Sequence, residues 1–188
     1  MRACNPCTAC CDGWLKINIQ GQAVHQGKPC AHSSGNGCRI YAERPVDPCV
    51  YFKCGWLGED STLPEWMKPV LAKVIFLPAQ SAWRGLLVDM AVPVGRSIPQ
   101  RALIWLRQHA EKSNRPLIWT ENLKQDGEFT EKQNVYAYGP VEFQEKTRKL
   151  VIEHDGSVRR ILNAMALPPA FRSPALGTVS ETSLPRYQ

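Results

Sequence analysis

The sequence has no long apolar run, no long run of like charges and none of the common short motifs of enzymes. Because no stretch approaches the roughly 18 to 20 apolar residues that cross a bilayer, we expect no membrane association. No nucleophile elbow, Walker A loop or dinucleotide-binding glycine pattern is present, so a non-enzymatic role is favoured over catalysis. The first residues also lack the apolar segment of a secretory signal, and we therefore expect a cytoplasmic protein.

The composition is that of an ordinary globular protein, with 44% hydrophobic and 21% charged residues among 188. The net charge is +6, which raises the question of a nucleic-acid partner. Residues 1–60, however, carry six basic and five acidic side chains, and the seventeen basic and twelve acidic side chains of the remainder are interspersed. A nucleic-acid-binding protein usually concentrates its positive charge on one face or helix. The charge pattern therefore disfavours nucleic acid as the partner.

Cysteine is absent after residue 54, although eight cysteines precede that point. They are arranged as Cys4-x2-Cys7-x2-Cys10-Cys11, Cys30-x7-Cys38 and Cys49-x4-Cys54. Core cysteines without ligands would be spread along the whole chain, and disulfides are rare in a reducing cytoplasm. A Cys-x-x-Cys turn, by contrast, brings two sulfur atoms within reach of one ion. The spacing therefore predicts that the cysteines are metal ligands.

Turn-forming residues, apolar periodicity and composition divide the chain into three regions. Residues 1–58 are rich in turns and too short to bury a stabilising core, so we expect a cysteine-cluster metal-binding lobe. Residues 63–167 predict a small α+β unit, and residues 168–188, rich in Pro, Ser and Thr, predict a disordered tail. The expected architecture is thus α+β, with a cysteine-rich, loop-rich, metal-stapled N-terminal lobe packed on the α+β unit. Trp56 and Trp66 flank the junction and are expected to dock the two.

Local patterns predict the individual elements. Alternating apolar residues predict a half-buried strand over residues 14–20. Ser97, followed by a proline and then by Gln100, resembles a capping box and predicts a helix that ends near residue 112. Further strands are expected at residues 73–77, 86–92, 115–121, 134–138 and 149–153, with a polar loop at 124–133 and a helix from Ser157 to residue 165.

The cysteine pattern resembles that of a known family. The CxxCxxCC run at residues 4–11 is followed by Gly-Cys-Arg-Ile-Tyr-Ala-Glu-Arg-Pro at residues 37–45 and by Cys-Val-Tyr-Phe-Lys-Cys at residues 49–54. Together these segments resemble the YkgJ-type bacterial cysteine-cluster proteins, which are described as zinc- or iron-chelating domains with eight cysteines. The resemblance covers about the first third of the chain and implies no particular biochemical activity. It implies metal chelation by Cys4, Cys7, Cys10, Cys11, Cys30, Cys38, Cys49 and Cys54.

Sequence alone leaves the choice between zinc and iron open. Four thiolates complete a tetrahedral zinc site, so eight provide two such sites or one compact two-metal cluster. An iron–sulfur cluster also takes four thiolates, and the first three cysteines resemble a ferredoxin triplet, although no cysteine here is followed by Pro. Because neighbouring side chains diverge, we expect Cys10 and Cys11 to serve different ions, or one of them to bridge. Since eight cysteines fill two sites, His32 is not expected to ligate.

Basic side chains near the cysteines can offset the negative charge of a metal–thiolate site. Arg44 is expected either to hydrogen-bond to the thiolates or to form a surface ion pair with Glu43 or Asp47. The predicted function is metal binding by a scaffold or interaction module with an unidentified protein partner. The alternatives are an iron–sulfur redox or metal-delivery protein and a zinc-ribbon-like nucleic-acid-binding protein.

Overall fold

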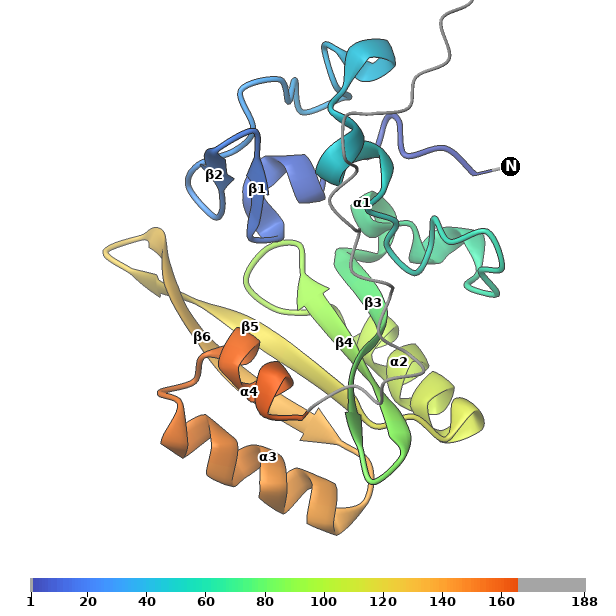
Figure 1. Ribbon diagram of the computed structural model, residues 1–188, viewed down its shortest axis with the longest axis vertical. Coiled ribbons are helices and arrows are strands. Elements are labelled where there is room, and N and C mark those ends of the chain that lie inside the picture. The colour runs from blue at the N-terminus through green and yellow to red at the C-terminus, as the bar shows by residue number, and fades with distance from the viewer. Residues whose placement is uncertain (1, 166–188) are drawn as a thin grey trace, which may run out of the picture.

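A four-stranded mixed sheet lies at the centre of the computed structural model, which describes residues 2–165 (Figure 1). Its strands are β3 (Val74–Trp83), β4 (Leu86–Pro93), β5 (Leu117–Gln125) and β6 (Glu128–Tyr138), in the order β3-β4-β5-β6. The pairs β3–β4 and β5–β6 are antiparallel, and β4 runs parallel to β5. A parallel pair needs a crossover connection, which helix α2 (Gln100–Ser113) provides. The predicted α+β class is therefore confirmed, whereas the tail predicted at 168–188 lies outside the described residues.

Helices cover both faces of this sheet (Figure 1). Leu106 of α2 belongs to the same hydrophobic core as Leu117 of β5. Helices α3 and α4 span Val141–Glu153 and Val158–Ala164. Ile161 of α4 packs in a second core with Ile118, the next residue along β5. The two cores follow from strand geometry, because neighbouring side chains of a strand point to opposite faces.

Helix α3 corrects one prediction. Residues 149–153, predicted as a strand, form the last turns of this helix. Phe143, Thr147 and Leu150 are buried and recur at helical spacing, so the helix presents one continuous face to the sheet. The short apolar run that suggested a strand is only the end of that longer pattern.

The hairpin between β5 and β6 corrects a second prediction. Instead of a loop at residues 124–133, the two strands continue until Gln125 pairs with Glu128. Asp126 and Gly127 then form the turn, with φ values of 53° and 86°. Positive φ at both central residues matches the twist of antiparallel strands, and Asp-Gly is a preferred pair for such a turn. The strands predicted at the four other positions of this sheet are confirmed, and all four are longer than expected.

The helices predicted after Ser97 and Ser157 are both present, but neither begins as expected. Helix α2 has Pro99 at its N-cap, without a side-chain bond, so the predicted capping box is wrong. Ser157 does precede α4, yet its hydroxyl makes no capping bond. The other helical segments are Cys10–Trp14, Tyr41–Glu43, Val46–Val50, Glu65–Met67 and α1 (Pro69–Ala72).

The part of the chain that carries the cysteines, residues 4–54, is called the cysteine segment below, and it lies at one end of the sheet (Figure 1). Its only described strands are β1 (Ile17–Ile19) and β2 (Gln22–Val24), which pair with each other. The strand predicted over residues 14–20 is therefore shorter than expected. Trp14 ends the preceding helical turn instead of starting the strand. Hydrogen-bonded regular structure thus accounts for little of this segment.

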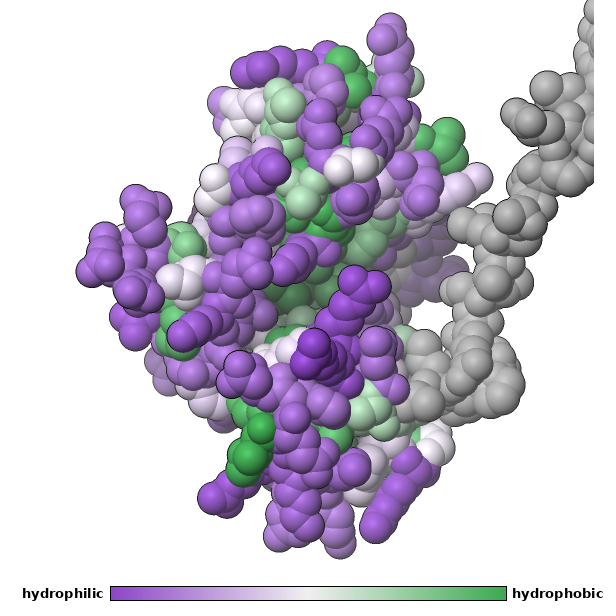
Figure 2. All heavy atoms as spheres, turned by 60° about the vertical axis from the view of Figure 1, so that its left-hand side comes forward, coloured by the Kyte–Doolittle hydropathy of each residue, from purple (hydrophilic) through white to green (hydrophobic). Residues whose placement is uncertain are grey.

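The cysteine segment and the sheet share one hydrophobic core. Cys54 and Trp56 are buried in the core that also contains Phe76 of β3. The backbone N–H of Gly55 donates to the carbonyl of Phe76 at 2.7 Å, and a Cβ at Gly55 would stand 2.5 Å from the Phe76 ring. The chain therefore approaches β3 as closely as only glycine permits. Figure 2 shows apolar side chains gathered in the middle of one face, with hydrophilic side chains above and below them.

The two junction tryptophans pack against different parts of the protein. Trp56 is 4% exposed, and the side chains of Arg2 and Lys68 lie over its ring at 4.9 and 5.1 Å. Trp66 meets Trp105 of α2 edge-on, with ring centroids 6.3 Å apart. Trp56 therefore lies in the core that the cysteine segment shares with the sheet, whereas the ring partners of Trp66 both belong to α2.

Replacing Trp56 with Ala should lower the free energy of unfolding by about 3–5 kcal/mol, because the change opens a cavity in the shared core. Urea unfolding followed by circular dichroism measures the loss. The control is Ile152→Ala, at a side chain that is 76% exposed, which should change the free energy by less than about 0.5 kcal/mol. Equal stabilities of the two variants would mean that Trp56 does not couple the cysteine segment to the sheet.

Candidate metal centre

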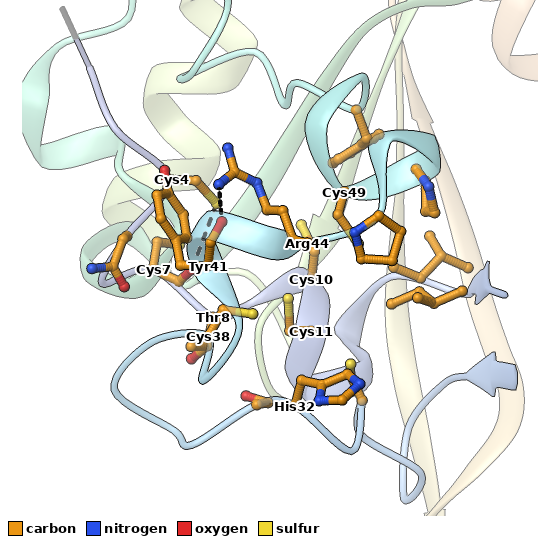
Figure 3. A pocket seen from close by; sticks show the side chains of 18 of the residues that line it. Cys4, Cys7, Thr8, Cys10, Cys11, His32, Cys38, Tyr41, Arg44 and Cys49 are labelled. Atoms are coloured by element: carbon orange, nitrogen blue, oxygen red, sulfur yellow. Dashed lines mark hydrogen bonds between the residues drawn. The ribbon is translucent and has the colours of Figure 1, made fainter.

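One cavity gathers the side chains of every cysteine in the chain (Figure 3). They are Cys4, Cys7, Cys10, Cys11, Cys30, Cys38, Cys49 and Cys54. Apolar side chains, among them Ile17, Ile19, Phe52 and Leu57, complete much of its wall. All eight thiols are free, so the described residues contain no disulfide between them. Segments far apart in sequence therefore bring all the predicted ligands to one place.

The first cysteines are placed by two consecutive turns. The N–H of Cys7 donates to the carbonyl of Cys4 at 2.6 Å, closing the first turn of the CxxC pattern. Cys10 then opens the helical turn that ends at Trp14. Within that turn Gly13 has a φ of 89°, and a Cβ there would lie 2.1 Å from the carbonyl oxygen of His25. The sequence needs glycine at this position because the turn packs directly on the backbone that follows β2.

A backbone bond ties the second pair of cysteines to the first run. The N–H of Cys30 donates to the carbonyl of Cys11 at 2.7 Å. Ser33 then donates its N–H to the Cys30 carbonyl and pairs with Cys38 in an antiparallel bridge. Cys30 and Cys38 are thus held beside Cys11 by local backbone geometry.

Asp12 links the same two segments through its carboxylate. The Thr8 hydroxyl donates to one carboxylate oxygen at 2.6 Å, and the Ser33 hydroxyl donates to the other at 2.6 Å. Thr8 is 3% exposed and lies 3.2 Å from the carbonyl of Gly35. Charge-assisted hydrogen bonds of this kind are stronger than neutral ones. Asp12 therefore clamps the loop of Cys38 onto the turn of Cys10 and Cys11, although the cysteine spacing gave no sign of it.

The last two cysteines flank a compact stretch. Cys49 lies on the helical turn Val46–Val50, and the N–H of Phe52 donates to the Pro48 carbonyl at 2.7 Å. The carbonyl of Cys54 accepts from the N–H groups of Leu57 and Gly58. Cys49 therefore sits on an outer turn, whereas Cys54 joins the core shared with the sheet.

The thiol of Cys10 is surrounded by other cysteines. Burial raises the pKa of Cys10 well above its usual value, and charge on Cys54, Cys4, Cys7 and Cys11 raises it further, in that order. Cys4 and Cys7 come from the beginning of the cysteine segment, and Cys54 comes from its end. Cys7 and Cys10 pack on the core that contains Cys54.

The thiol of Cys11 has a different set of neighbours. Burial, followed by charge on Cys4, Cys30, Cys49 and Cys38, raises the pKa of Cys11 to about 12. For Cys49 the cysteines that raise the pKa are likewise Cys30 and Cys38. Charge on Cys4 raises the pKa of both Cys10 and Cys11, so the surroundings of these two thiols overlap.

Packing and backbone bonds divide the eight cysteines into two adjoining sets of four. In the inner set, Cys7 and Cys10 pack on the core that contains Cys54, and Cys4 shares a turn with Cys7. The outer set is the other four: the backbone joins Cys30 to Cys11 and Ser33 to Cys38, and Cys49 lies on an outer turn. Each set has the number of thiolates that one zinc ion or one iron–sulfur cluster requires. The influence of Cys4 on Cys11 shows that the two sets share a boundary.

Arg44 lies at that boundary (Figure 3). Its guanidinium stacks 3.9 Å from the centre of the Tyr41 ring and donates one hydrogen bond, of 2.5 Å, to the Tyr41 carbonyl. Its positive charge lowers the pKa of Cys4, from the inner set, and of Cys49, from the outer set. The buried Nε atom has no hydrogen-bond partner among the described residues. Among the described residues Arg44 therefore makes neither a hydrogen bond to a thiol nor an ion pair with Glu43 or Asp47, and its partner is Tyr41 instead.

Two other basic side chains of the segment turn away from the cavity. Lys16 pairs with Glu131 at 3.1 Å, and Lys53 pairs with Glu59 at 2.5 Å. Both pairs are exposed, so solvent screens them and each contributes little to stability. They also neutralise positive charge that a nucleic acid would otherwise meet on this segment.

The donor chemistry fits zinc or iron, but the side chains do not form a finished coordination site. Within residues 2–165, no three His, Cys, Asp or Glu side chains stand around one point as ligands of a single ion. The eight sulfur atoms share a cavity, and each can swing about its Cα–Cβ bond. Ligation therefore requires the thiols to turn inwards around the ion. His32 is exposed at the edge of the same cavity.

Arg2 is a positioning residue that the sequence analysis missed. Its guanidinium donates to the carbonyls of Trp56 and Leu63 at 2.8 and 2.6 Å and to the Ser61 hydroxyl at 2.9 Å, and it pairs with Glu65 at 2.8 Å. These bonds fix the chain two residues before Cys4. No motif marks Arg2, because its partners lie more than fifty residues away in sequence.

Comparison with known proteins gives no relative for this chain. No protein-family model matches it, and no curated protein and no solved structure is similar to it. No helix within residues 2–165 is long and apolar enough to span a membrane. The geometry of the cavity is therefore the main guide to function.

Replacing Asp12 with Ala should destabilise the metal-free, reduced protein by about 1–3 kcal/mol, because the change leaves two hydroxyls without their acceptor. Urea unfolding measures the effect, and Asp60→Ala at an exposed carboxylate is the matched control. A loss no larger than that of the control would contradict the clamp.

Metal binding should release at least about five protons per chain at pH 7. Burial raises the pKa of Cys4 to about 11 and that of Cys11 to about 12, and it also raises the pKa values of Cys10, Cys49 and Cys54. These five thiols are protonated at pH 7 and must lose the proton to ligate, so affinity should fall as the pH falls. Calorimetry in buffers of different ionisation enthalpy counts the protons. Release of fewer than about two would exclude ligation by these thiols.

Proposed function

We propose that this protein is a metal-binding protein that chelates zinc or iron through its eight cysteines. The observation that carries the proposal is the convergence of all eight cysteine side chains on one cavity from turns as distant as residues 4 and 54. Soft thiolate donors favour zinc and iron–sulfur clusters over hard cations. Free thiols of this number also fit a reducing compartment, which supports a cytoplasmic location.

The resemblance to the YkgJ-type cysteine-cluster family supports the same proposal. The chain carries the family's CxxCxxCC run and the full set of eight cysteines. We include membership of that family in the proposal, because a shared cavity is what a common ligand set would require.

Metal binding would also explain how the cysteine segment holds its shape. Its strands are three residues long, and most of its other backbone hydrogen bonds close turns or join loops. Binding of zinc contributes roughly 10–16 kcal/mol in zinc-finger peptides at neutral pH, which is more than the stability of most domains. We propose that the bound metal staples this segment into a lobe on the α+β unit.

A protein partner is supported by apolar side chains close to the cavity. Val46 is 53% exposed, Val50 is 39% exposed and Tyr51 is 59% exposed, and all three lie within three residues of Cys49. Aromatic and apolar side chains are common at the centres of protein interfaces. The metal would thus shape a surface that a partner recognises, as expected of a scaffold or interaction module.

An iron–sulfur redox or metal-delivery role is the second candidate. The apolar wall of the cavity favours it, because solvent exclusion is one of the factors that set the potential of an iron–sulfur cluster. A redox role requires an iron–sulfur cluster, and a delivery role requires a labile metal site.

Elemental analysis and an absorption spectrum of anaerobically purified protein test the proposal. About two zinc ions per chain and a colourless sample are expected for the scaffold, whereas a brown, iron-containing sample would favour the redox role. Cys7→Ser should remove about half of the metal, and Thr62→Ser, at an exposed position, serves as the control. A reduced sample that holds neither metal would contradict the proposal.

A further inference from the structure

The inner and outer sets of cysteines differ in what surrounds them. Cys54 is 7% exposed and belongs to the core that includes β3, β4 and α2, and Cys7 and Cys10 pack against that core. Arg2 holds the chain just before Cys4 by four side-chain contacts. Opening the inner set would therefore require the cysteine segment to leave the body of the protein.

The outer set has fewer contacts with the core: only Cys11 lies on a turn, Cys10–Trp14, whose neighbouring side chains pack there. None of its four cysteines belongs to either hydrophobic core of residues 2–165. Cys30 and Cys38 lie in a loop whose residues are mostly exposed, and Cys49 is on the outer turn next to Val50. The loop is held by the Cys30–Cys11 backbone bond and by the Asp12 clamp. Segments with few buried contacts open at low free-energy cost while the core stays folded.

An exposed histidine and exposed apolar side chains lie close to the outer set. His32 is exposed and lines the cavity, so its imidazole can bind an ion that is leaving the thiolates. Val46, Val50 and Tyr51 supply exposed apolar contacts beside Cys49. An acceptor molecule would therefore reach an ion in the outer set more readily than an ion in the inner set.

We infer that the two sets hold metal with different permanence: the inner set retains a structural ion, and the outer set exchanges its ion with a thiol- or imidazole-bearing acceptor. This inference rests on the proposed function. The exchange moves one divalent ion to the acceptor without any change of oxidation state, and the four thiolates left behind take up protons from solvent. The ion in the inner set stabilises the fold, and the ion in the outer set is delivered to the acceptor.

Release of zinc to the chromogenic chelator 4-(2-pyridylazo)resorcinol tests the inference on the full, reduced, zinc-loaded chain. Two phases of equal amplitude are expected, with rates that differ by at least about tenfold. Circular dichroism should change only in the slow phase, because the fast ion leaves a folded protein. A single phase, or loss of structure in the fast phase, would overturn the inference.

Two further measurements assign the phases. Cys30→Ser should abolish the fast phase and leave the slow one, and Ser34→Ala, in the same loop, should leave both phases in place. If Cys30→Ser does not fold, alkylation of partly chelated wild-type protein by N-ethylmaleimide, read by mass spectrometry, gives the same information. The outer cysteines should be labelled first, and earlier labelling of Cys54 would overturn the inference. A chain that takes up neither zinc nor iron would contradict the proposed function itself.

Discussion

Eight thiols share one cavity, and burial there disfavours the ionised, metal-binding form of several of them. Burial and mutual repulsion raise the pKa of the thiols of Cys4, Cys10 and Cys11 far above neutral pH. The cations that lower the pKa of Cys4 are Arg44 and Lys68, and their effect does not outweigh burial. Under the proposed function, a divalent ion would supply the missing charge at the centre of each set. The arrangement of the cysteine segment is then best understood as preparation for an ion.

The rest of the protein gives this segment a fixed support. The segment has little regular structure, and polar contacts together with one patch of shared core hold its turns in place. Arg2 and Asp12 supply the polar contacts, and Trp56 supplies the core. The mixed sheet and its helices contain no cysteine, since none follows residue 54. The α+β unit thus supports a centre whose chemistry resides in the N-terminal third.

The sequence predicted the parts of this account that depend on local pattern. Alternation and apolar runs located the four strands of the sheet, and the clustering of cysteines located the cavity. Pattern failed where a short window was ambiguous: residues 149–153 read as a strand because the helical spacing that includes Phe143 extends beyond them. The spacing of the cysteines in the sequence also could not assign them to the inner and outer sets. That assignment depends on which loops lie side by side in the folded chain. Arg2 and Asp12 were missed for the same reason, since their partners are distant in sequence.

The central claim is that the sulfur atoms of this chain bind metal directly. X-ray absorption fine structure of the purified, anaerobic protein tests it, because the spectrum reports the atoms bound to the metal and their distances. The account predicts a first shell of about four sulfur atoms per metal, at about 2.3 Å if the metal is zinc. A first shell made mainly of oxygen or nitrogen atoms would contradict it.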